Sequence, residues 1–231
     1  KYTERLNIHY ARMGEPIFNR SVFEFSYWLA ACKKQIFDDS GVRIEVIHPV
    51  LTTSLPKRFK HLEDRINEWV TIKNVFFNGQ AGLQFSINST SDIQRDEMFG
   101  NEQISLLSLA EIAYKLPEPL SRKYCLNFAY STDFEFDAKK IDRLFDKEKF
   151  MVKITPIHNN NACRDNNIVT VGGYDSWMPY QRPEEDLKAL GWDVLVFVPS
   201  FDEEDGLVTC GNAVLGGGKV NARSVINING Q

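Results

Sequence analysis

The chain has 231 residues, of which 43% are hydrophobic and 25% are charged, a composition typical of a globular protein with one sizeable core. Its formal net charge of −4 excludes an overall basic surface for nucleic acid, so a nucleic-acid substrate would have to be held by local patches or by a part not present here. No apolar run of about 18 residues is present, so no membrane span is predicted, and the four scattered cysteines offer no metal-ligand spacing and favour a reducing, cytoplasmic compartment.

The first predicted strand covers residues 6–10, where bulky and polar residues alternate, and a turn with Gly14, Glu15 and Pro16 follows it. The glycine lets a ligand approach the backbone, and the glutamate places a carboxylate at the carboxyl end of the strand. In parallel α/β sheets this end is where ligands bind. An ordinary turn is the alternative interpretation of the same residues.

The rest of the chain alternates between predicted strands and predicted helices. Segments rich in β-branched and aromatic residues predict strands at 42–53, 83–88, 124–130, 150–157 and 192–199. Apolar residues at helical spacing predict helices within 21–37, 57–70, 91–99, 106–116, 137–145 and 182–190. Such alternation indicates an α/β fold with six parallel strands joined by right-handed crossovers.

Polar or small residues stand at or just after the ends of several predicted strands. They are Gly14, Glu15, Thr52, Ser54, Ser86, Asn88, His158 and Asn160. Because the carboxyl ends of parallel strands meet at one edge, we expect these residues to form a polar pocket there. The hydroxyls near Pro56 have a second interpretation, because they could instead cap the helix that follows.

Six short segments occur in the order found in one group of radical enzymes. They are Met13-Gly14-Glu15-Pro16, Leu51-Thr52-Thr53-Ser54, Phe85-Ser86-Ile87-Asn88-Ser89, residues 153–160, residues 179–185 and Thr209-Cys210-Gly211-Asn212. With these segments the chain resembles the carboxyl-terminal part of a radical S-adenosylmethionine enzyme, and it is most similar to the RlmN/Cfr RNA adenosine methyl synthases. The resemblance covers about residues 6–213.

The resemblance implies a partial (β/α)6 barrel with parallel strands that lacks the first strand and the cluster loop of the family. This barrel, with a carboxyl-terminal cysteine loop, would span residues 1–213. Residues 214–231, which contain three consecutive glycines at 216–218, would form a flexible tail.

The resemblance also implies a binding site for the cofactor S-adenosyl-L-methionine. Its residues would be Gly14, Glu15, Thr52, Ser86, Ile87, Asn88 and Asn160. Gly14 and Glu15 would meet the methionine end, whose ammonium needs carbonyls and a carboxylate. Asn160 would lie at the adenine, although aligning the chain on Pro156 would put His158 there instead.

Cys210 matches the catalytic cysteine of the family, a thiolate that accepts a methyl group and later presents it to a radical. A buried small residue before a glycine turn is the alternative interpretation of Cys210. The family binds a 4Fe–4S cluster through Cys-x₃-Cys-x₂-Cys before the Gly-Glu-Pro turn, and this sequence contains no such motif. We therefore expect the cluster only if a missing amino-terminal part supplies three cysteines; a degenerate relative is the other interpretation.

The implied function is methylation of an RNA adenosine through a methyl-cysteine intermediate. The substrate would be rRNA or tRNA, and a flavodoxin-type protein would donate the electron. Two alternatives stay open at this point. One is a radical S-adenosylmethionine enzyme that acts on a protein or small molecule, and the other is a cluster-free barrel that serves as a binding module.

Overall fold

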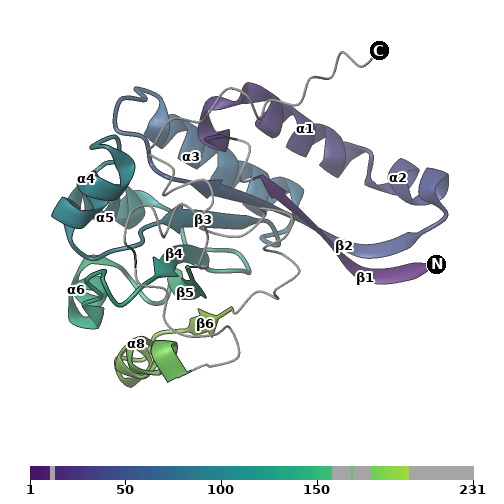
Figure 1. The fold of residues 1–231 in the computed structure, drawn as a ribbon. Helices are drawn as coiled ribbons and strands as arrows, with labels where there is room; N and C mark the ends of the chain where they lie inside the picture. The colour runs from purple at the N-terminus through teal and green to yellow at the C-terminus, as the bar shows by residue number, and fades with distance from the viewer. Residues whose placement is uncertain (11–13, 158–167, 169–177, 198–231) are drawn as a thin grey trace, which may run out of the picture.

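The computed structural model describes residues 1–10, 14–157, 168 and 178–197 of the chain (Figure 1). In these ranges six strands form one sheet in the order β1-β2-β3-β4-β5-β6, and each neighbouring pair is parallel. The sheet curls into a half-barrel with the helices packed along its outside (Figure 1). The prediction of an α/β fold with six parallel strands in a partial barrel is confirmed.

The elements follow one another along the chain much as predicted. The strands are β1 (Tyr2–Tyr10), β2 (Arg43–Thr53), β3 (Gly82–Ser86), β4 (Tyr124–Tyr130), β5 (Phe150–Pro156) and β6 (Val194–Val196). The α-helices are α1 (Arg20–Ala31), α2 (Lys33–Ser40), α3 (Leu62–Thr71), α4 (Asp92–Phe99), α5 (Leu106–Lys115), α6 (Ala138–Leu144) and α8 (Met178–Ala189). Two short segments are the 3₁₀ turn η1 (Pro16–Phe18) and the π-helix η2 (Ile72–Phe76).

Several elements differ from their predicted boundaries: β1 starts at Tyr2 instead of residue 6, α8 starts at Met178 instead of residue 182, and two further differences have a visible cause. The helix predicted at 21–37 is divided at Cys32, because the φ of −96° and ψ of 10° of this residue leave the helical region. The strand predicted at 192–199 starts later, at β6, because Trp192 turns its indole toward α6 and donates to Oδ1 of Asp142 at 3.0 Å. Residues 198–231 lie outside the described residues, and with them the predicted boundary between a barrel at 1–213 and a tail at 214–231.

The hydrophobic core lies between the outer face of the sheet and the helices. Leu83 and Phe85 of β3 and Phe128 of β4 are fully buried in it. Trp69 of α3 is also fully buried, and its indole Nε1 donates to the backbone oxygen of Gly82 at 2.9 Å. Burying one such side chain stabilises the fold by about 1.5–3 kcal/mol, so this packing attaches the helices to the outer face.

The inner face of the sheet carries polar side chains among apolar ones such as Val50 and Met151, since side chains alternate between the two faces along each strand. The register aligns Thr52 of β2 with Gln84 of β3, and Gln84 with Cys125 of β4. The next row along the strands consists of Ser86, Asn127 and Lys153. The positions of β1 to β6 that share this face carry no carboxylate in the described residues.

Candidate functional site

The carboxylate of Glu15 joins the turn after β1 to the end of β2. Its Oε2 accepts hydrogen bonds from the backbone nitrogen of Ser54 at 2.7 Å and from the Ser54 hydroxyl at 2.6 Å. Its Oε1 accepts a third bond, from the backbone nitrogen of Ile17 at 3.1 Å. Hydrogen bonds to a charged group are the short and strong ones, so Glu15 holds two strand ends in a defined position. A carboxylate has about four acceptor sites, which leaves about one for an external donor.

Gly14 gives a ligand access to the backbone beside this carboxylate. Its φ is +96°, a conformation that side chains rarely adopt, and a Cβ atom placed on it would meet nothing within 4 Å. The predicted pair of Gly14 and Glu15 therefore lies at the carboxyl end of β1, with open space on one side and a fixed charge on the other.

Thr52 lies on the inner face of β2, one strand away from Gly14. Its hydroxyl donates a long hydrogen bond of 3.4 Å to Oε1 of Gln84. Both side chains are half-buried, so they remain open to a ligand on the inner face. Gln84 was not among the predicted residues, and the register with Thr52 is what brings it into the site.

The three predicted residues at the end of β3 lie in different surroundings. Ser86 is half-buried and stands on the inner face. The side chain of Ile87 belongs to the hydrophobic core, and its backbone nitrogen donates to the oxygen of Asn127 at 2.8 Å. Asn88 is buried, and its Oδ1 accepts a hydrogen bond from the backbone nitrogen of Ala129 at 3.0 Å. The amide oxygen of Asn88 thus bonds the backbone of β4, and the assignment of Asn88 to the cofactor stays a prediction.

Two backbone positions at this edge have an unusual conformation. Leu55 follows the end of β2 and Asn88 follows the end of β3, and both have a φ of +63°. Asparagine tolerates this region, but for a leucine it costs roughly 1–2 kcal/mol. Leu55 is fully buried, and its nitrogen donates to Oγ1 of Thr53 at 3.0 Å. Strained residues of this kind cluster at functional sites. Their presence therefore favours a functional site at the carboxyl edge of β2 and β3.

Besides Gln84, three further polar side chains of the inner face were not predicted: Asn127, Lys153 and Thr155. Nζ of Lys153 lies 5.1 Å from the centre of the Phe197 ring, within the range of a cation–π contact. Oγ1 of Thr155 is buried and has no hydrogen-bond partner among the residues that the structure describes. Each of the three is a polar residue at an alternate position of an otherwise apolar strand. This pattern in the sequence could have indicated that they lie on the inner face of the sheet.

The remaining predicted site residues cannot be placed. His158, Asn160 and Cys210 all lie outside the described residues. Of the cysteines that are described, Cys125 is buried on the inner face of β4, and burial raises the pKa of its thiol to about 12. Cys32 lies between α1 and α2. Cys125 is therefore a neutral thiol at physiological pH.

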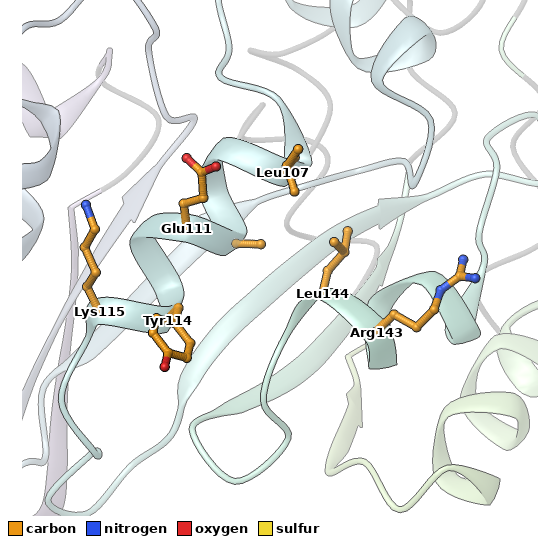
Figure 2. A pocket seen from close by; sticks show the side chains of 7 residues that line it. Leu107, Glu111, Tyr114, Lys115, Arg143 and Leu144 are labelled. Atoms are coloured by element: carbon orange, nitrogen blue, oxygen red, sulfur yellow. The ribbon is translucent and has the colours of Figure 1, made fainter.

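A hollow of about 480 Å³ lies on the outside of the molecule, between α5 and α6. Leu107, Glu111 and Tyr114 line it from α5, and Arg143 and Leu144 line it from α6. Figure 2 shows that the polar ends of Glu111, Tyr114 and Arg143 point away from one another. Small-molecule sites have polar groups that converge, so we place the candidate site at the carboxyl edge of the sheet and not in this hollow.

A comparison of the chain with protein-family models found no match, and a comparison with curated proteins found none either. In the part of the chain that the structure describes, no helix has the length and apolar character needed to cross a membrane. The fold and the site together define the class of the protein: an α/β half-barrel that has polar side chains on its inner face and a fixed carboxylate at the carboxyl edge of its sheet.

Proposed function

We propose that the carboxyl edge of the half-barrel binds S-adenosyl-L-methionine and that the chain is part of a radical S-adenosylmethionine enzyme that methylates an RNA adenosine. The observation that carries this proposal is the fixed carboxylate of Glu15 beside the open backbone of Gly14. Parallel α/β sheets bind their ligands at this edge. The order of the six sequence segments supports the same assignment.

The side chains at this edge fit the polar groups of the cofactor. A methionine ammonium needs an acceptor, and Glu15 has about one free acceptor site. Thr52, Gln84 and Ser86 offer hydroxyl and amide groups that suit the ribose hydroxyls. Lys153 on the same face supplies a cation that suits the methionine carboxylate.

The described cysteines do not fit the 4Fe–4S cluster of this enzyme class. Cluster ligands are thiolates, whereas Cys125 is buried with its pKa raised to about 12, and Cys32 lies on another element. When bound, the cluster would supply the electron that cleaves the cofactor. The proposal therefore requires three ligand cysteines beyond the printed sequence, together with a flavodoxin-type electron donor.

In the proposed reaction Cys210 accepts the methyl group as a thiolate. The bond from the methyl carbon to the sulfonium sulfur breaks, a bond to Sγ of Cys210 forms, and S-adenosylhomocysteine leaves. The support for Cys210 and for Asn160 at the adenine, with His158 as the alternative, is the resemblance alone. In the complete enzyme, Cys210→Ala should abolish methyl transfer to RNA and leave cofactor cleavage intact.

Two other functions would use the same edge and can be told apart from the first. If the substrate is a protein or small molecule, the Cys210→Ala enzyme keeps its activity, because Cys210 is then only structural. The second alternative, a cluster-free binding module, is favoured by the absence of the three-cysteine motif from this sequence. Such a module would bind the cofactor but never form 5′-deoxyadenosine.

Calorimetry on the 231-residue chain tests the cofactor site without needing the cluster. We expect saturable binding of S-adenosyl-L-methionine, weakened about tenfold in Glu15→Gln, which equals about 1.4 kcal/mol. Glu97→Gln is the matched control, because Glu97 is an exposed carboxylate on α4. Absence of binding by the folded wild-type chain, or equal weakening by both substitutions, would overturn the proposal.

A further inference from the structure

Basic side chains gather on the inner face of β1 and β2, away from the carboxyl edge. The strand register sets Asn7 of β1 opposite His48 of β2. Arg5 and His9 stand two residues on either side of Asn7, so they share its face of the sheet. His48 is buried, and β1 thus carries two basic residues beside its imidazole.

The turn before β3 brings further basic residues to the same place. Nζ of Lys73, which is fully buried, donates to the backbone oxygen of Gly79 at 2.8 Å. The backbone nitrogen of Arg122 donates to the same oxygen at 3.2 Å. Nδ1 of His48 bonds the next carbonyl along the chain, that of Gln80. The peptide groups of Gly79 and Gln80 therefore contact His48 and the backbone of Arg122, while Nζ of Lys73 lies on the core side of the sheet, 5.7 Å from the centre of the Tyr124 ring.

Acidic side chains do not balance this charge in the described parts of the chain. None of Arg5, Lys73 and Arg122 forms an ion pair with a carboxylate there. Burial and the nearby Arg5 lower the pKa of Arg122, and burial and Arg122 lower the pKa of Lys73 to about 8. The lowered pKa values have two causes: burial removes water from the cations, and the cations repel one another. A bound anion would offset both effects and stabilise the charged side chains.

We propose that this basic cluster binds a phosphate group, either inorganic phosphate or the phosphate of a small monoester, between Arg5 and Arg122. A guanidinium presents a planar fork of donors that matches phosphate oxygens, and two such forks can hold one anion. His48 uses Nδ1 to donate to Gln80, so its neutral ring has no proton left on Nε2, and the two guanidinium groups are the donors to the anion.

The burial of the cluster favours a single phosphate group over a polymer. Lys73 and His48 are buried and Arg122 is half-buried, whereas Arg5 is exposed, so the cluster reaches solvent at Arg5. His48 and Thr52 are four residues apart on β2, which at about 3.3 Å per residue is roughly 13 Å. The phosphate site is therefore distinct from the carboxyl edge and stands independently of the proposed function.

Calorimetry on the whole chain with inorganic phosphate and with ribose 5-phosphate tests the proposal and distinguishes the two sources of the anion. Ribose and sodium chloride at matched ionic strength are the control ligands. We expect saturable binding of at least one phosphate compound, weakened about tenfold or more by Arg5→Gln and by Arg122→Gln. Arg143→Gln is the matched control, because Arg143 is an exposed arginine on the outer helix α6, and it should bind as the wild type does.

The imidazole resonances of His48 give a second readout that does not depend on the heat of binding. We expect them to shift as phosphate is added to the wild type and to stay unchanged in Arg122→Gln. Arg5 is exposed, so Arg5→Gln should remain folded and should bind S-adenosyl-L-methionine as the wild type does. The proposal is overturned if neither phosphate compound binds saturably, or if chloride produces the same signal as phosphate. It is also overturned if Arg143→Gln weakens phosphate binding as much as Arg5→Gln does, or if the chain binds an RNA oligonucleotide but neither phosphate compound.

Discussion

Glu15 and Ser54 are joined by two hydrogen bonds to one carboxylate oxygen, from the Ser54 backbone nitrogen at 2.7 Å and from its hydroxyl at 2.6 Å. The two residues are 39 positions apart in the chain, so this contact fixes the carboxyl ends of β1 and β2 relative to each other.

Removing the charge of Glu15 should destabilise the fold as well as the cofactor site. Hydrogen bonds to a charged group contribute about 1.5–3 kcal/mol, so we expect Glu15→Gln to lower the free energy of unfolding by about 1–2 kcal/mol. Ser54→Ala removes one of the bonds and should cost about 1 kcal/mol. Urea denaturation of both variants and of the double variant measures the coupling, and strictly additive losses would contradict a shared interaction.

Gly14→Ala should separate backbone strain from ligand access. The φ of +96° at Gly14 disfavours a side chain, although nothing lies within 4 Å, so we expect a loss of about 1 kcal/mol in unfolding free energy. Gly41 at the end of α2 is the matched control, because its φ is +63° and its surroundings are equally open. Both variants should lose similar stability in urea, and only Gly14→Ala should weaken S-adenosyl-L-methionine binding. A similar loss of binding in Gly41→Ala would contradict a local effect.

Asn88 should tolerate aspartate better than alanine. Asn88→Ala removes the acceptor of the Ala129 nitrogen and keeps the strained φ of +63°, so we expect a loss of about 2–3 kcal/mol. Asn88→Gly also loses the acceptor but relieves the backbone, and it should be about 1 kcal/mol more stable than the alanine variant. Asn88→Asp keeps an acceptor and should lie closest to the wild type. Thermal denaturation ranks the three, and an alanine variant as stable as aspartate would contradict the assigned hydrogen bond.

His48 should make the fold sensitive to acid. Burial, followed by the charge of Arg122, lowers the pKa of His48 to about 4 in the folded chain, below its ordinary value of about 6.5. The unfolded chain therefore binds a proton at His48 more readily than the folded chain does. The neutral His48 contributes fully to the free energy of unfolding above about pH 6.5, and this contribution is lost as the pH falls toward about 4. The full loss is about 3 kcal/mol.

Urea denaturation at several pH values between about 7.5 and 4.5 checks this prediction, within the window set by the two pKa values of His48. We expect His48→Gln to show a shallower fall in stability over this range than the wild type. His61→Gln is the matched control, because the His61 side chain is 70% exposed, and it should keep the wild-type slope. Identical slopes in the wild type and His48→Gln would show that His48 is not the group that titrates.

The alternation of strand and helix patterns was enough to predict the parallel α/β sheet, and the turn at Gly14 and Glu15 was enough to predict a carboxylate at its edge. Both are local properties, because periodicity and turn residues act over a few neighbouring positions. The prediction for Asn88 shows where local reasoning stops. Its assignment to the cofactor stays a prediction, but no local pattern indicated that its amide oxygen accepts a hydrogen bond from the backbone nitrogen of Ala129, 41 positions away.

The sequence by itself determined which residues are apolar, how they are spaced and therefore which elements form. Only the tertiary structure decided which polar groups meet: Glu15 with Ser54, Thr52 with Gln84, and the basic residues around Gly79 and Gln80. The physical reason is that these contacts depend on strand register and on the curl of the sheet, which are set by the packing of the whole core and are not encoded in any single segment.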